Sequence, residues 1–102
     1  MLTTITGKHF EITGTVREYA DEKVSKLPRY YNSINRCDIV VEGDKAAGAN
    51  VEVIVTAVHG KVFIGTESGP DVYGCIDSAV HKLQGQLRKA KTKERNNKHT
   101  RT

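Results

Sequence analysis

Lysine and arginine side chains gather at the end of the chain, in a pattern suited to neutralising a polyanion. From His81 onward the sequence holds eight Lys and Arg residues and one acidic residue, Glu94, for a formal charge of +7. Residues 1–80 hold eight basic and eleven acidic side chains, so they carry −3 and the whole chain +4. This asymmetry is typical of nucleic-acid-binding proteins, and an anionic membrane surface is the second candidate partner.

The residue types that catalyse reactions or bind metals form no recognisable motif. No two of the four histidines lie four residues apart, so the helical zinc motif H-E-x-x-H is absent. Neither Cys37 nor Cys75 has a Cys or His three or four residues away, and we expect both thiols to be reduced and buried. No P-loop, G-x-S-x-G or G-x-G-x-x-G motif occurs. The sequence therefore predicts no catalytic residue, no metal and no cofactor, and a protein that is not an enzyme.

Length and composition indicate one domain in a soluble, intracellular chain. The chain has 102 residues, of which 37% are apolar, and its mean hydropathy is −0.49. It contains no apolar run approaching the roughly 20 residues that span a bilayer, and its first residues do not resemble a secretory signal. We expect a single α/β domain at residues 1–95 and a disordered basic tail at 96–102.

The first of two predicted helices spans residues 15–27. Its apolar side chains share one face at helical spacing: Val16, Ala20, Val24 and Leu27. Pro28 ends the helix, and the N-cap is either Thr15, in a capping box with Glu18, or Thr13.

The second predicted helix begins at Gly69-Pro70, with Pro70 at the first helical position and Asp71 at the positive end of the dipole. Its apolar series steps by threes and fours through Val72, Ile76, Ala79, Val80, Leu83, Leu87 and Ala90. Such a helix is a rod of roughly 30–35 Å.

Four strands complete the prediction, at residues 2–6, 36–43, 50–58 and 61–68. The last three form an antiparallel meander, with a two-residue connection at His59-Gly60. The order β-α-β-β-β-α predicts an α+β fold, in which one four-stranded sheet carries both helices on one face.

Basic residues border the apolar stripe of the second helix on both sides. One flank holds Lys82, Gln86, Lys89 and Lys93, and the other holds Arg88, Lys91 and Arg95. An ordinary solvated helix face mixes charge signs, whereas this one accumulates repulsion that an anionic partner would offset.

The first helix adds basic side chains near its apolar arc. If the helices lie side by side, their groove would hold one patch suited to an A-form RNA backbone, formed by Lys23, Lys26, Lys82 and Lys89. Tyr30, Tyr31 and Tyr73 either stack on bases or pack at the edge of the core, and packing is the favoured interpretation.

Three segments together resemble the ribosome hibernation-promoting factors: ITGKHFEIT, VREYADEKVSKLPRYY and DVYGCIDSAVHKLQGQLRKAKTK. The resemblance runs across residues 1–93 and includes the order of the elements. It is to the short form of the family, because a long form would need an additional C-terminal domain and a related inhibitor ends in an acidic tail.

The resemblance implies a fold whose layout is similar to that of double-stranded RNA-binding domains. It also implies binding to the small ribosomal subunit and its rRNA in the cytoplasm, in stationary phase or stress. The protein would occupy the decoding region, block mRNA and tRNA binding and silence translation. Short forms also favour inactive ribosome dimers, so other hibernation factors are further candidate partners. No membrane and no small-molecule substrate is implied.

By position, the rRNA contacts of the family carry over to basic residues on both helices. They are Lys23, Lys26, Lys82, Lys89, Lys91 and Lys93, with Arg17 as a weaker candidate. Relatives of the short form often have Arg where this chain has Gly85, and we expect Arg88 to replace that charge from a different face.

Two other interpretations remain open at this point. The basic helix could dock on an acidic protein partner, as part of a protein–protein regulator. A helix on a membrane surface is the weaker alternative, because the apolar face is needed for the sheet and lacks Trp and Phe.

Overall fold

The computed structural model describes the backbone of residues 1–100 and the side chains of residues 1–94. The elements follow the predicted order β-α-β-β-β-α. Their bounds are β1 Leu2–Lys8, α1 Gly14–Val24, β2 Ile34–Asp44, β3 Gly48–Ala57, β4 Val62–Gly69 and α2 Val72–Thr100. Short 3₁₀ turns lie at Leu27–Arg29 and Val58–Gly60.

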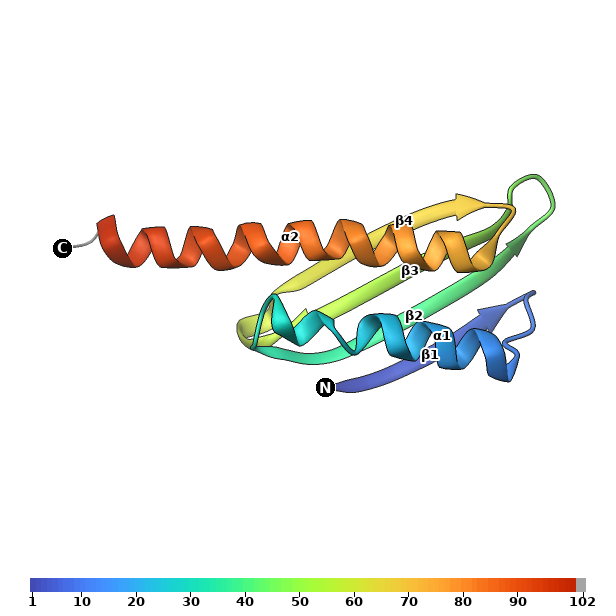
Figure 1. Ribbon diagram of the computed structural model, residues 1–102, viewed down its shortest axis with the longest axis horizontal. Helices are drawn as coiled ribbons and strands as arrows, with labels where there is room; N and C mark the ends of the chain where they lie inside the picture. Colours follow the sequence, from blue (N-terminus) through green and yellow to red (C-terminus); the bar gives the residue numbers. More distant parts are fainter. Residues whose placement is uncertain (101–102) are drawn as a thin grey trace.

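One four-stranded sheet organises the molecule, with the strand order β1-β2-β3-β4. β1 pairs with β2 in parallel, and the other two pairings are antiparallel, so the predicted meander of β2, β3 and β4 is confirmed. Both helices cover the same face of the sheet and run in a similar direction, with α1 over β1 and β2 and α2 toward β4 (Figure 1). The predicted α+β fold class is therefore confirmed.

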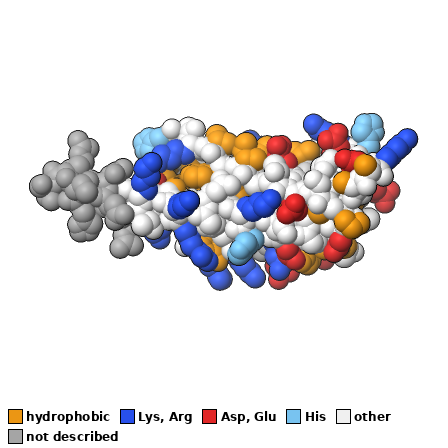
Figure 2. All heavy atoms as spheres, turned by 90° about the horizontal axis from the view of Figure 1, so that it is seen from above, with side chains coloured by type: hydrophobic (Ala, Val, Ile, Leu, Met, Phe, Trp, Pro, Cys, Tyr) orange, Lys and Arg blue, Asp and Glu red, His pale blue; other side chains and the backbone are white. Residues whose placement is uncertain are grey.

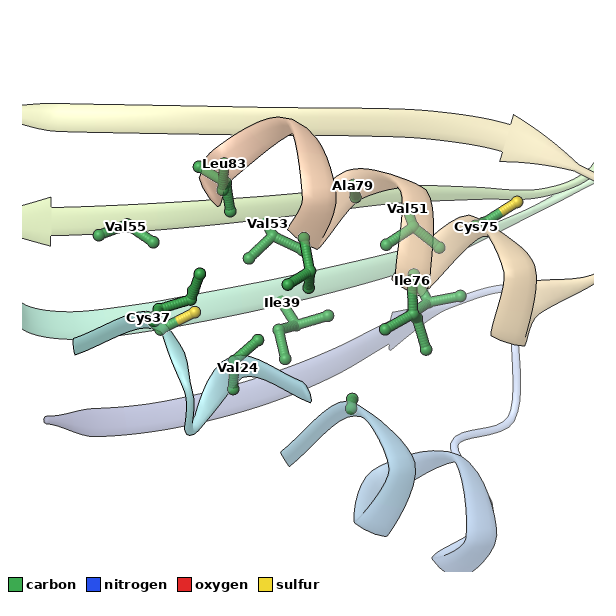
Figure 3. Close-up of a cluster of buried hydrophobic side chains, with 14 of the residues drawn as sticks. Val24, Cys37, Ile39, Val51, Val53, Val55, Cys75, Ile76, Ala79 and Leu83 are labelled. Atoms are coloured by element: carbon green, nitrogen blue, oxygen red, sulfur yellow. The ribbon is translucent and has the colours of Figure 1, made fainter. Parts of the chain in front are cut away.

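The core lies between the sheet and the two helices. Strand residues of alternate positions point inward, including Ile39 on β2 and Val53 on β3, and the apolar stripe of α2 is buried against them. Figure 3 shows Ile76 and Leu83 of α2 over the strands. Because this stripe is covered by the sheet, it is not free to lie on a membrane surface. No helix in the described part of the chain combines the length and apolar character needed to cross a bilayer.

The thiols of Cys37 and Cys75 belong to this core. Both are free and buried, as the sequence predicts. Burial raises the pKa of the Cys37 thiol to about 12, which disfavours the thiolate that a nucleophile or metal ligand requires.

α1 begins earlier and ends earlier than predicted. Thr13 is the N-cap, because its hydroxyl accepts a hydrogen bond from the Val16 amide (3.2 Å). Thr15 lies within the helix, so the capping box that begins at Thr15 does not form. After Val24 the chain turns into the 3₁₀ segment Leu27–Arg29, where Pro28 fits the early positions of a new turn.

α2 is capped by Asp71. The Asp71 carboxylate accepts a hydrogen bond from the Tyr73 amide (3.1 Å), and its carbonyl accepts one from the Cys75 amide. Pro70 therefore precedes the helix, and the prediction that it occupies the first helical position is wrong. The backbone of α2 is described as far as Thr100, and residues 101–102 lie outside the described part of the chain. The domain boundary at residue 95 and the disordered tail at 96–102 stay predictions.

The connection between β3 and β4 contains His59 and Gly60, but the prediction that it has only two residues is wrong. β3 ends at Ala57 and β4 begins at Val62, with a 3₁₀ turn at Val58–Gly60 between them. His59 and Gly60 both have positive φ values, 64° and 72°, a conformation that glycine adopts readily and that suits a turn. The Ala57 amide donates to the Lys61 carbonyl and closes the turn (2.8 Å).

Candidate nucleic-acid interface

The flank of α2 that faces β4 is tied to the edge of the sheet. Lys82 Nζ donates to the Thr66 carbonyl (2.9 Å) and lies 3.5 Å from the Glu67 carboxylate. One turn further on, the Gln86 amide donates to the Ile64 carbonyl (2.8 Å). These two side chains satisfy carbonyls on the exposed edge of β4, which has no further strand beside it.

This arrangement corrects one prediction, the single patch between the helices formed by Lys23, Lys26, Lys82 and Lys89. Lys82 reaches β4 on the side of α2 away from α1, and Lys89 follows on the same flank two turns later. Helical periodicity sorts residues onto flanks, but it does not tell which flank faces the neighbouring helix.

The opposite flank of α2 is joined to α1. The Tyr19 hydroxyl donates to the Asp77 carboxylate (2.7 Å), and the Tyr19 ring meets that of Tyr73 edge-on at 5.0 Å between centroids. Lys23 Nζ lies 3.5 Å from Asp77 and 5.2 Å from the centre of the Tyr19 ring. The hydrogen bond to Asp77 raises the pKa of Tyr19 to about 12. Lys23 therefore has its charge balanced within the contact between the helices.

Packing accounts for the tyrosines. Tyr31 is buried and meets Phe63 edge-on, with 5.6 Å between ring centroids. Tyr73 packs on Tyr19, and the Arg88 guanidinium makes a cation–π contact with Tyr30, 5.0 Å from the centre of its ring. The interpretation that favoured packing over base stacking is confirmed for Tyr31 and Tyr73.

Glu94 joins three elements at the basic end of the molecule. Its carboxylate accepts hydrogen bonds from the Tyr31 hydroxyl (2.8 Å) and from Lys61 Nζ (3.0 Å). The hydrogen bond to Glu94 raises the pKa of both partners. Lys61 also lines a shallow hollow between β4 and α2 together with Lys93. Sequence reasoning missed Lys61 because it stands in a hairpin, far along the chain from the basic helix.

Four lysines of the helix layer differ from those above, because no acid pairs with them among the described residues. They are exposed, and they are Lys26, Lys89, Lys91 and Lys93. Figure 2 shows Lys and Arg side chains prominent toward the C-terminal half of α2, whereas Asp and Glu side chains are more frequent toward the other end. An exposed cationic surface without internal partners is suited to phosphate groups.

The arrangement of the described residues offers no support for a catalytic or metal-binding site. Within the described residues, no group of three His, Cys, Asp or Glu side chains is placed to hold a metal ion. The arrangement can contribute charge, shape and hydrogen-bond donors to a binding surface.

Comparison with known proteins places the chain in a family. It matches the family described as Sigma 54 modulation protein / S30EA ribosomal protein over residues 3–95. The chain belongs to this family. It is 36% identical over 92 residues to the ribosome hibernation promoting factor of Klebsiella oxytoca, and 34% identical over 89 residues to that of Escherichia coli strain K12. Each alignment covers 87% of this chain and 92% of the relative.

Solved structures similar to this S30EA family member share its fold. The N-terminal domain of Thermus thermophilus Protein Y matches with a TM-score of 0.77 at 28% identity, over 87% of this chain and 98% of that one. A ribosomal subunit interface protein from Coxiella burnetii matches with a TM-score of 0.81 at 25% identity, over 90% and 99%. Family membership confirms the resemblance stated from the sequence, and with it the prediction of a protein that is not an enzyme.

The S30EA family does not by itself identify which side chains bind. The predicted rRNA-binding residues all lie on the helix layer, at Lys23, Lys26, Lys82, Arg88, Lys89, Lys91 and Lys93. Lys23 and Lys82 each form an ion pair with a carboxylate, and Arg88 makes a cation–π contact with the Tyr30 ring. The other four have no ion-pair partner among the described residues. The set as a binding site stays a prediction.

Proposed function

We propose that this protein is a ribosome hibernation factor that binds the small ribosomal subunit at its decoding region. Relatives at 34–36% identity are named ribosome hibernation promoting factors, and a structural neighbour is named a ribosomal subunit interface protein. The proposed place of action is the cytoplasm, in stationary phase or stress.

The observation that carries this proposal is a set of exposed cations on the helix layer that have no ion-pair partner among the described residues: Lys26, Lys89, Lys91 and Lys93. Like charges at such spacing destabilise a helix unless an anion compensates them. Ribosomal RNA supplies phosphates at high density, and phosphate contacts position a protein without reading sequence.

The mechanism that follows is steric. A rigid domain seated on rRNA in the channel for mRNA and tRNA prevents both from binding, and no bond is made or broken. Occupied subunits are silent, and we propose that this state favours inactive ribosome dimers.

Sedimentation with purified bacterial small ribosomal subunits at several salt concentrations tests the proposal. Contacts to six or so phosphates give a slope of log affinity against log salt of roughly −4 to −5.5. Affinity that does not change between low and high salt would contradict phosphate contacts.

A charge-reversal pair sharpens the same test. Lys89→Glu combined with Lys93→Glu should abolish co-sedimentation at physiological salt. Lys45→Glu, an exposed lysine in the β2–β3 turn, is the control and should leave it unchanged. Full binding by the double variant would instead favour a partner that contacts another surface.

A further inference from the structure

Gly85 lies on the outward face of α2, and the fold gives no reason for a glycine there. A Cβ added at Gly85 would have no atom within 4 Å, whereas one added at Gly65 would meet the Ala79 carbonyl oxygen at 2.4 Å. Its φ is not among the positive values of this chain. Glycine is the poorest helix former after proline, so its place in the middle of a long exposed helix is a cost to folding.

Four basic or titratable side chains surround this bare position one helical turn away. His81 and Lys82 come four and three residues before it, and Arg88 and Lys89 three and four residues after it. All four are exposed. No acidic side chain stands between Asp77 and Glu94 on the helix, so no carboxylate of α2 itself lies in this ring.

The ring is open because two of its members are held away from the centre. Lys82 leans to β4, where it binds the Thr66 carbonyl, and Arg88 leans the other way onto the Tyr30 ring. Their positive groups therefore border a stretch of helix backbone that no side chain covers. An anion that contacts the backbone here lies between cations on both sides.

We propose that Gly85 and the residues around it form a seat for one phosphate of an RNA backbone. This inference rests on the proposed function and names one subsite of it. The sugar–phosphate chain approaches α2 closely at Gly85 because no Cβ stands in its path. Lys89, which has no ion-pair partner among the described residues, donates a charge-assisted hydrogen bond to the phosphate. Lys82 and Arg88 keep their contacts to the Thr66 carbonyl and the Tyr30 ring, and they border the seat as positive charges. His81 borders the seat on the preceding turn.

A neutral side chain at position 85 distinguishes phosphate binding from helix stability, because it should strengthen the helix and weaken the binding of RNA. Gly85→Gln adds a good helix former without charge, so the melting temperature should rise by several degrees. Affinity for purified small ribosomal subunits should nevertheless fall about tenfold, and the salt slope should shrink by about 0.7–0.9, the contribution of one phosphate. Gly85→Ala should raise stability in the same way and weaken binding less.

Ser78→Gln is the matched control, because Ser78 lies seven residues earlier on the same face, at the acidic end of α2. It should bind as the unmodified chain does. Equal affinity and slope for Gly85→Gln and the unmodified chain would overturn the seat and leave the proposed function standing. Equal weakening by both glutamines would also overturn it, since bulk anywhere on the face would then matter. No binding by the unmodified chain at low salt would overturn the proposed function and the seat together.

Discussion

The lysines of the helix layer, and Lys61 in the hairpin beside it, differ in whether a carboxylate pairs with them. Lys23 and Lys82 each pair with a carboxylate at 3.5 Å, and Lys61 pairs with Glu94 at 3.0 Å. These pairs are partly exposed, so each contributes little to stability, but each fixes the direction of a side chain. Lys89, Lys91 and Lys93 have no such anchor among the described residues and remain available for phosphates.

The contact between Tyr19 and Asp77 gives a test at the scale of one hydrogen bond. It raises the pKa of the Tyr19 phenol from its ordinary 10.0 to about 12. A raised phenol pKa stabilises the fold below pH 10 or so, and this contribution is lost as the pH rises through about 12. Asp77→Asn removes the charge and should move the phenol back toward its ordinary pKa, as followed by tyrosinate absorbance in an alkaline titration.

Tyr19→Phe is the control for this titration. It should remove the late transition that belongs to Tyr19 and leave the other tyrosines as they were, including Tyr31, whose pKa is also raised. A late transition of the same size in Asp77→Asn would show that another tyrosine, such as Tyr31 beside Glu94, is its source.

Two glycines on or under α2 act in opposite directions at the scale of an element. Gly65 of β4 lets α2 approach the sheet, because a Cβ there would lie 2.4 Å from the Ala79 carbonyl oxygen and 3.1 Å from the Leu83 side chain. Gly65→Ala should therefore push the helix outward and destabilise the fold by about 1–3 kcal/mol. Urea denaturation followed by circular dichroism measures the change.

Gly85→Ala is the matched control for this prediction. The added methyl group meets nothing, so stability should rise by up to ~1 kcal/mol. A stable Gly65→Ala variant would mean that α2 does not depend on this close approach.

Periodicity and turn chemistry were sufficient to predict the elements, but not how they meet. The alternating apolar residues, such as Ile39 and Val53, predicted β2 and β3, because burial of one sheet face requires apolar side chains at every second position. The turn residues His59 and Gly60 predicted where the chain reverses between β3 and β4, because they tolerate positive φ values. The side of α2 that Lys82 faces depends on where the helix lies across β3 and β4. The pairing of Lys61 with Glu94 joins residues 33 positions apart, which no local pattern encodes.

At the scale of the whole molecule, the charge distribution favours binding at the expense of stability. Basic side chains are prominent along the C-terminal half of α2, and acidic ones are more frequent toward its start (Figure 2). The backbone at the C-terminal end of α2 extends past the sheet (Figure 1). Repulsion among its cations is a cost that a bound polyanion would remove.

This trade-off predicts a substitution that stabilises the free protein and weakens its binding. Lys89 and Lys93 are like charges four residues apart, a pair that costs about 0.2–0.5 kcal/mol. Lys89→Glu converts it to an attractive pair with the acid on the N-terminal side, so the free energy of unfolding at low salt should rise by roughly 0.5–1 kcal/mol. The gain should shrink at ~1 M salt, where charges are screened within about 3 Å.

Lys45→Glu is the control, because it places a like charge beside Asp44 and should therefore lower the free energy of unfolding at low salt. Urea denaturation of both variants at two salt concentrations measures the effect, and a gain for Lys89→Glu that is independent of salt would rule out repulsion as its cause.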